Sequence, residues 1–294
     1  MVKKYALFLG CLIPLRIPSV EIAARKVFRK LGAELVDMPG YSCCPEPVTS
    51  RLVDRDMALV VAARNLSIAE WMGLDLLVLC NGCYETLVEA QETLMDEPEE
   101  MKRVNSILSK VGRRYTGKVR VRHFLEVLYE DFGVDAVRKL VSRPMRGVSA
   151  AIHYGCHLFR PSPGQEDIWA KPRMMEELAD ASGAEMRKYG VERLCCGFPS
   201  MQADEEFALK ERLLPKLRKA RDAGANCLLA VCPACLVQFE TGQTLLRRYG
   251  EKFEFPCMHL MELLALAMGV PAAELSLDFH RSPVSRFVGS LGGV

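Results

Sequence analysis

The cysteines of this chain follow one order twice, and this repeat limits the possible folds more than any other feature. In each copy a lone cysteine is followed by an adjacent pair and then by two cysteines that are separated by two residues. The first copy comprises Cys11, Cys43, Cys44, Cys80 and Cys83, and the second comprises Cys156, Cys195, Cys196, Cys232 and Cys235. In both copies 35 residues lie between the pair and the next cysteine, whereas the pair follows the lone cysteine after 31 residues in the first copy and 38 in the second. Such a period indicates an internal duplication.

The residues around the cysteines repeat as well. The segment ALFLGC that ends at Cys11 matches AIHYGC that ends at Cys156, and His123 lies in a segment that resembles the one around His259. We expect both histidines to cap or anchor a helix. The stretch SRPMRG, at 142–147, is typical of a linker. The sequence therefore predicts two homologous domains, residues 1–144 and residues 145–294.

Each half alternates short aliphatic runs with helical patterns. In the first half the candidate strands are Tyr5–Leu9, Leu35–Met38 and Leu74–Leu79. Strands that alternate with helices predict an α/β fold with short parallel sheets, one in each half. Four cysteines, Cys11, Cys80, Cys156 and Cys232, directly follow such runs. Because open α/β sheets bind ligands at the carboxyl ends of their strands, we expect the five thiols of each half to converge there.

Two helix boundaries follow from residue type. Ser19 is a candidate N-cap for a helix that runs to Leu31 and stops at Gly32. Asp54 is a candidate start for a second helix, which Gly73 would end.

Charge and composition exclude several classes of protein. The formal net charge is only +2 and the basic residues are scattered, so the sequence does not predict a nucleic-acid interface. No apolar run reaches the roughly 18–20 residues of a membrane-spanning helix. The apolar stretch Tyr5–Leu9 is shorter than the core of a secretory signal, so we expect a cytoplasmic protein. In a reducing compartment, clustered thiols bind metals or perform redox chemistry more often than they form disulfides.

The number of thiols favours one class of metal site. A structural zinc site uses four ligands, whereas each half of this chain offers five, two of them adjacent in sequence. Adjacent thiolates reach one metal ion only with strain, but they can bind two irons of a cluster. Thiolates are typical iron–sulfur ligands, so the pattern favours a cluster in each half. A non-catalytic scaffold that binds zinc is the alternative.

The doubled pattern resembles the cysteine-rich CCG domain, and nearly the whole chain is similar to the B subunit of heterodisulfide reductase. The segments VRHF at 121–124, YGCH at 154–157 and CNGC at 80–83 share this resemblance. It implies a catalytic subunit with two noncubane [4Fe–4S] clusters, each held by one set of five cysteines, with one cysteine bridging two irons. In that family the substrate disulfide lies between the clusters, which supply the electrons that split it, and iron captures the sulfurs.

The resemblance also implies partners and a substrate. A ferredoxin-like C subunit and a flavin-containing A subunit, possibly with a hydrogenase or formate dehydrogenase, would supply electrons. The substrate would be the coenzyme M–coenzyme B heterodisulfide or a related small disulfide. Two departures bear on the substrate: Pro45 stands where the second copy has Gly197, and FPSM follows Gly197 where many relatives have glycines. The alternative is an electron relay to or from quinone beside a membrane, for which the apolar stretch Met258–Met268 could serve as the contact.

Several further residues have two interpretations. His157, beside Cys156, is a candidate proton donor to a departing thiolate, or a histidine satisfied by the backbone. Arg160, in a loop found only in the second half, is a candidate contact for an anionic substrate, although most surface arginines have no such role. For His153 we favour a hydrogen bond to the backbone. The two remaining cysteines, Cys227 and Cys257, are expected to pack in the core.

Overall fold

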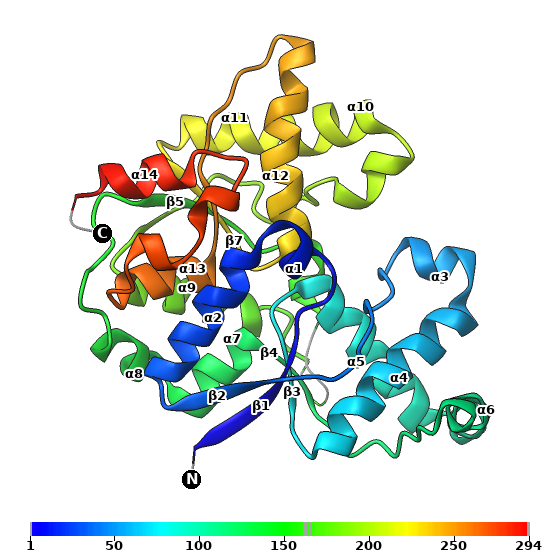
Figure 1. Ribbon diagram of the computed structural model, residues 1–294. Helices are drawn as coiled ribbons and strands as arrows, with labels where there is room; N and C mark the ends of the chain where they lie inside the picture. Colours follow the sequence, from blue (N-terminus) through cyan, green and yellow to red (C-terminus); the bar gives the residue numbers. More distant parts are fainter. Residues whose placement is uncertain (1, 161–163, 165, 293–294) are drawn as a thin grey trace.

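The computed structural model describes residues 2–160, 164 and 166–292. Two four-stranded parallel sheets form its framework, with strand orders β2-β1-β3-β4 and β6-β5-β7-β8. Strands β5 to β8 take the same places in the second sheet as β1 to β4 take in the first, so the two halves share one topology. The duplication and the α/β class predicted from the sequence are therefore confirmed (Figure 1).

The first half contains strands β1 to β4 and helices α1 to α8. Their bounds are β1 Lys3–Phe8, α1 Leu12–Arg16, α2 Pro18–Lys30, β2 Ala33–Asp37, α3 Thr49–Val53, α4 Arg55–Met72, β3 Leu76–Val78, α5 Asn81–Asp96, α6 Pro98–Leu108, β4 Val121–His123, α7 Phe124–Glu126 and α8 Val134–Lys139. All three strands expected in this half are present, within two residues of the expected bounds at each end. The short β4 was not among them.

The second half repeats this order. Its elements are β5 Ser149–His153, the 3-10 turn η3 Cys156–Phe159, α9 Ala170–Ala181, β6 Glu185–Arg187, α10 Glu205–Phe207, α11 Leu214–Asp222, β7 Cys227–Ala230, α12 Pro233–Leu246, β8 Cys257–His259, α13 Leu260–Ala267 and α14 Val284–Ser290. In each sheet the first strand of the half is central, and it pairs in parallel with the second and third strands.

Three of the four predicted helix ends are confirmed. Asp54 caps α4 by accepting a hydrogen bond from the backbone N–H of Met57, and Gly73 ends that helix in the left-handed conformation. Gly32 likewise follows α2 with a φ of +78°. The prediction for Ser19 is wrong, because Pro18 already occupies the first helical position and Ile17 is the cap. Proline suits that position, since the first N–H of a helix has no intrahelical acceptor.

Two histidines at equivalent positions of the repeat cap short helices, as predicted. Nδ1 of His123 accepts a hydrogen bond from the backbone N–H of Leu125, while the backbone N–H of His123 donates to the Glu126 carboxylate at 2.7 Å. His259 and Glu262 form the same capping box at the start of α13. Each box satisfies backbone N–H groups that the helix leaves without a partner.

The two halves are joined by a packed interface. Helix α2 of the first half lies against α13 of the second (Figure 1), and Lys26 pairs with Glu274 across this contact at 2.5 Å. The segment expected to be a linker is ordered by hydrogen bonds, because the N–H groups of Ser142 and Arg143 both donate to the carbonyl of Ala267. The boundary between residues 144 and 145 lies in this segment and stays a prediction.

The apolar stretch Met258–Met268 belongs to the core. Every residue of this stretch is at most 1% exposed, so it is not an exposed surface that could contact a membrane. Among the described residues, no helix combines the length and the apolar character needed to cross a bilayer.

Candidate iron–sulfur site

Six of the ten cysteines lie where a strand gives way to a helix or a turn. Cys11 follows β1 and precedes α1, and Cys156 opens the turn η3 after β5. The remaining four begin the longer helices: Cys80 and Cys83 at α5, Cys232 and Cys235 at α12. The N-terminus of a helix carries partial positive charge and free N–H groups, which favour the thiolate form that binds metal.

The adjacent cysteines lie in loops that follow the second strand of each half. In the first half, Asn65 on α4 holds this loop by accepting from the N–H of Ser42 at 3.0 Å and donating to the carbonyl of Cys43 at 3.2 Å. In the second half, Gly197 turns the chain with a φ of +92°, and its N–H donates to the sulfur of Cys195 at 3.4 Å. The two loops thus present equivalent cysteines by different means.

All ten cysteines line one cavity of about 260 Å³, so the expected convergence within each half extends to both halves together. The sulfur atoms form a series of neighbours in the order Cys11, Cys43, Cys44, Cys83, Cys80, Cys232, Cys235, Cys196, Cys195 and Cys156. The series is symmetric about its centre, where the Sγ atoms of Cys80 and Cys232 lie 3.9 Å apart. Each half therefore contributes one contiguous set, and the two sets meet.

Two glycines leave room beside the sulfurs. Gly10 has a φ of +64°, and a Cβ at this position would lie 2.8 Å from the Sγ of Cys83. Gly155 has a φ of +77°, and a Cβ there would lie 3.6 Å from the Sγ of Cys235 and 2.8 Å from the Asn81 side chain. Only glycine combines this backbone conformation with so close an approach.

The thiols perturb one another strongly. Hydrogen bonds from Cys43 and Cys83 lower the pKa of Cys44 to about 6, and those from Cys156 and Cys196 lower the pKa of Cys195 to about 2. Hydrogen bonds with Cys44 and Cys80, together with burial, raise the pKa of Cys83 well above the usual value. Hydrogen bonds with Cys196 and Cys232, together with burial, do the same for Cys235. Ten thiolates around one cavity would repel each other, and metal cations remove that repulsion. The donor set fits a group with several metal ions in each half.

His157 and Arg160 have different surroundings. His157 lines the cysteine cavity, and its Nδ1 pairs with the Glu85 carboxylate on α5. Burial lowers the pKa of His157, although the nearby Cys232 and Cys195 thiolates oppose that effect. Arg160 is not among the residues that line the cavity.

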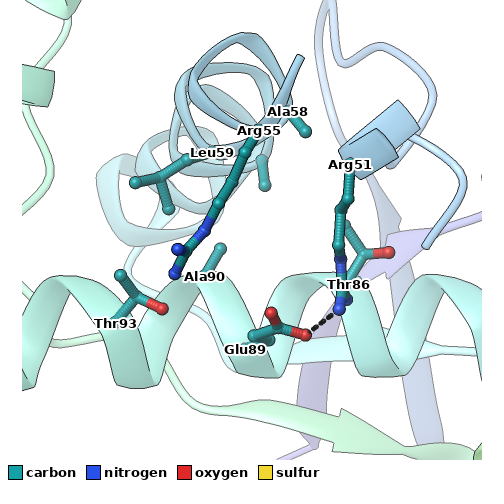
Figure 2. Close-up of a pocket in the computed structure, with 9 residues that line it drawn as sticks. Arg51, Arg55, Ala58, Leu59, Thr86, Glu89, Ala90 and Thr93 are labelled. Atoms are coloured by element: carbon teal, nitrogen blue, oxygen red, sulfur yellow. Dashed lines mark ion pairs between the residues drawn. The ribbon is translucent and has the colours of Figure 1, made fainter. Parts of the chain in front are cut away.

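The guanidinium of Arg160 forms ion pairs with carboxylates of α5. It pairs with Glu92 and lies 3.8 Å from Glu89, which also pairs with Arg51 (Figure 2). Arg51 and Glu89 border a separate hollow between α4 and α5 of about 30 Å³, room for one or two water molecules at most. The role of Arg160 toward an anionic substrate stays a prediction, and the observed ion pairs do not point to it.

Asn81 is a site residue that sequence reasoning missed. It lies between two cysteines of the first set, where its Oδ1 is 3.0 Å from Nε2 of His123 and its Nδ2 donates to the carbonyl of Tyr154 at 2.8 Å. It thereby ties the start of α5 to the loop that carries Cys156. The available signal was a polar residue at a position where the second copy has Pro233.

The two cysteines outside the sets lie on strands of the second sheet. Cys227 on β7 and Cys257 on β8 are fully buried, and neither borders the cysteine cavity. The prediction that they pack in the core is confirmed.

Comparison with known proteins agrees with this arrangement. The family described as "Cysteine-rich domain", CCG, matches residues 5–88 and 150–240, one match in each half. A solved structure titled "Crystal structure of a hypothetical protein from Helicobacter pylori" has a TM-score of 0.74 and 19% identity. It covers 95% of this chain, which in turn covers 52% of that one, and it shows the fold alone.

Curated relatives are similar over almost the full length. The B subunit of the ferredoxin/F420H2-dependent CoB-CoM heterodisulfide reductase of Methanosarcina acetivorans is 36% identical over 94% of this chain and 92% of its own length. The 8-methylmenaquinol:fumarate reductase membrane anchor subunit of Wolinella succinogenes is 31% identical over 95% and 97%. These matches support an iron–sulfur electron-transfer role. With both cysteine sets in place around one cavity, the chain belongs to the CCG cysteine-rich family that includes the B subunit of heterodisulfide reductase.

Proposed function

We propose that this chain is the catalytic iron–sulfur subunit of a heterodisulfide reductase-type complex, which reduces a small disulfide at the cavity shared by the two cysteine sets. The coenzyme M–coenzyme B heterodisulfide or a related sulfur compound is the proposed substrate. The observation that carries this proposal is the meeting of the two sets at Cys80 and Cys232, because a disulfide placed there has one sulfur beside each set.

The ligand assignment follows the two sets. Cys11, Cys43, Cys44, Cys80 and Cys83 would hold one noncubane [4Fe–4S] cluster, and Cys156, Cys195, Cys196, Cys232 and Cys235 would hold the other. When bound, these clusters supply electrons one at a time. The cavity provides an apolar wall from Leu9, Leu12, Pro47 and Phe198, which suits the hydrocarbon part of a thiol substrate.

Reduction of a disulfide consumes two electrons and two protons and releases two thiols. His157 is the residue proposed to deliver a proton, because it is the histidine that borders the cavity. Glu85 engages its Nδ1, which fixes the ring and leaves Nε2 as the atom that exchanges the proton. Burial lowers its pKa, so the ring is mostly uncharged near neutral pH and passes on to a departing thiolate a proton that it takes up.

The electrons must reach the chain from other subunits. We propose a ferredoxin-like C subunit and a flavin-containing A subunit as partners, either alone or together with a hydrogenase or formate dehydrogenase. The name of the Methanosarcina relative, which includes ferredoxin and F420H2, supports a low-potential donor.

The test is the iron and acid-labile sulfide content of anaerobically purified protein, with EPR recorded during titration with candidate thiols and disulfides. We expect about eight irons per chain, the total for two four-iron clusters, and a signal that a substrate induces. Zinc in place of iron, in protein never exposed to air, would refute the enzyme and establish the scaffold.

A second candidate is an electron relay to or from quinone. The similarity to the Wolinella membrane anchor subunit favours it. This function needs no sulfur substrate, so full iron content, electron exchange with a quinone and no response to any disulfide would support the relay instead.

A further inference from the structure

One buried polar side chain next to the second cysteine set lacks a well-formed hydrogen bond to any described residue. His153 is the last residue of β5, and its side chain is 1% exposed. Neither of its ring nitrogens meets hydrogen-bond geometry with any described residue. The backbone of Glu192 is the expected kind of partner and acts on the ring, but it falls short of full hydrogen-bond geometry.

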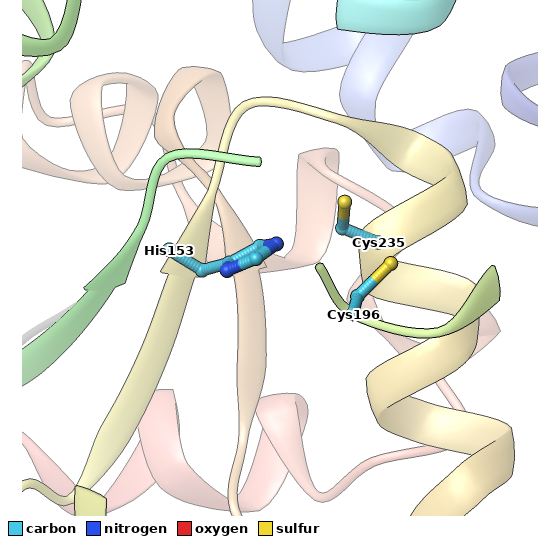
Figure 3. Close-up of side chains that lie close together, drawn as sticks. All are labelled: His153, Cys196 and Cys235. Atoms are coloured by element: carbon cyan, nitrogen blue, oxygen red, sulfur yellow. The ribbon is translucent and has the colours of Figure 1, made fainter. Parts of the chain in front are cut away.

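The ring nitrogen faces sulfur. A ring nitrogen of His153 and the Sγ atoms of Cys196 and Cys235 all lie within 4.8 Å of one another (Figure 3). Phe239 covers the ring edge-on, with 4.9 Å between the ring centroids, and keeps water from it. A buried N–H group without a well-formed hydrogen bond is unfavourable, so this position favours an acceptor in the cavity.

The first half has an apolar residue at the equivalent place. Phe8 is the last residue of β1 and precedes Cys11 by three positions, as His153 precedes Cys156. The rings occupy matching positions: from a Cβ built on Gly10 the Cε1 of Phe8 is 4.0 Å away, and from one built on Gly155 the Nε2 of His153 is 3.9 Å away. The fold therefore accepts an apolar ring here, and the polar ring of the second half is not needed for packing.

The imidazole ring offers an N–H donor in either charge state. A neutral imidazole carries one N–H donor and one acceptor. The sulfur of a thiolate or sulfide only accepts hydrogen bonds, so it can interact with the N–H of the ring but not with the ring's acceptor nitrogen.

We propose that the N–H of His153 donates a hydrogen bond to a sulfur of the iron–sulfur group held by the second set, and that this bond gives the second site a higher reduction potential than the first. An electron that enters the group adds negative charge to its sulfurs, and an N–H dipole stabilises that charge. No proton is transferred and no bond is broken. His153 thus acts as a residue that tunes the potential, and Phe8 leaves the first site without this effect. The inference rests on the proposed function only in taking both sets to hold clusters.

The test exchanges the two rings. His153→Phe gives the second site the residue of the first, Phe8→His does the reverse, and His153→Gln keeps an N–H donor. Potentials are measured by EPR-monitored redox titration of the anaerobically purified full chain, with circular dichroism and iron content as controls. The signals are assigned from Cys196→Ala, which lacks a ligand of the second set.

We expect His153→Phe to lower the midpoint potential of the second site alone, His153→Gln to lower it less, and Phe8→His to raise that of the first site. Unchanged potentials in His153→Phe with full iron content would overturn this inference and leave the proposed function standing. No iron in the unsubstituted protein would instead refute the proposed function.

A second measurement separates a hydrogen bond from direct ligation. In protein labelled with nitrogen-15 histidine, pulsed EPR should show a weak nitrogen coupling at the second site that disappears in His153→Phe. A strong coupling, or loss of iron from the second set in His153→Phe, would mean that His153 binds iron and would overturn the hydrogen-bond proposal.

Discussion

The two halves hold equivalent cysteines in unequal surroundings. In the first half, Phe8 and Pro45 flank the cysteines and Asn65 secures the loop of the adjacent pair. In the second half, His153 and Gly197 stand at the corresponding places. The cysteines and the sheet topology repeat closely, but the groups next to the sulfurs do not. The difference shows that one cysteine frame can be combined with two different electrostatic environments.

The strongest test of the comparison removes one ligand at a time. Cys196→Ala should lose the iron of the second set and keep that of the first, and Cys44→Ala should do the opposite. The reason is that the sulfur neighbours of each of these cysteines belong to its own half. About half of the iron should remain in each variant. Cys227→Ala, a buried thiol away from the cavity, is the matched control and should keep all of it. Full iron retention in Cys44→Ala or Cys196→Ala would refute the ligand assignment.

His157 is the proposed proton donor, and the first half has Leu12 at the corresponding position, so replacing it tests whether the two halves differ in function. We expect His157→Gln to retain iron but to slow disulfide reduction by about 10²–10⁴-fold, the usual contribution of a general acid. Steady-state turnover with a reduced dye as donor would measure this. Arg160→Gln is the comparison, because its ion pairs with α5 predict only a small change. Equal rates for His157→Gln and the unsubstituted chain would exclude the proton-delivery role.

The carboxylates of the two capping boxes have different cationic partners. Glu126 lies 3.8 Å from the ammonium of Lys171, whereas Glu262 lies 2.8 Å from Nε2 of His280. Burial lowers the pKa of His280, but attraction to Glu262 and hydrogen bonds to Glu240 and Glu262 outweigh it and raise the pKa to about 10. The pKa of the unfolded chain is lower, so His280 stabilises the fold fully below about pH 6.5 and loses that contribution as the pH rises toward 10.

This asymmetry should be visible in denaturant unfolding. We expect the free energy of unfolding to fall by on the order of a few kcal/mol between about pH 6.5 and pH 10. His280→Gln should remove most of this dependence, with hydrogen exchange locating the change around α13. If the free energy of unfolding falls with pH just as steeply in His280→Gln, groups other than His280 cause the loss of stability at alkaline pH.

The smallest effect concerns the two glycines with matched backbone conformation. Gly10→Ala and Gly32→Ala each place a side chain at positive φ, which should cost about 1–2 kcal/mol in either case. Only the Cβ at position 10 would meet a sulfur, whereas the one at position 32 has nothing within 4 Å. Thermal unfolding should therefore shift to lower temperature in both variants, further in Gly10→Ala, and iron should be lost from the first set only in Gly10→Ala. Normal iron content in Gly10→Ala would contradict this prediction and show that the chain around residue 10 shifts enough to accommodate the added Cβ.

Local signals predicted much of this structure. The repeat indicated the duplication, and the residue types at Asp54, His123 and His259 identified helix starts because each acts on N–H groups within three residues of itself. Ser19 failed as a cap because the fixed φ of Pro18 starts the helix earlier, and the Ser19 hydroxyl lies 3.3 Å from His280 instead.

The remaining features depend on contacts between distant segments. The carboxylates that engage His157 and Arg160 belong to α5 of the other half, so no local pattern could reveal them. The same holds for the shared cavity, because spacing predicts convergence within a half but not the placement of one sheet against another. The environment of His153 depends on Phe239 and the cysteine loop together.

The contact between Cys80 and Cys232 has a consequence for how the protein is supplied with electrons. With 3.9 Å between these sulfurs, no insulating layer of side chains separates the two sets. With clusters held as proposed, an electron delivered to one set would need no mobile carrier to reach the other. A single docking site for the donor, on one half, would then be enough to serve both sets.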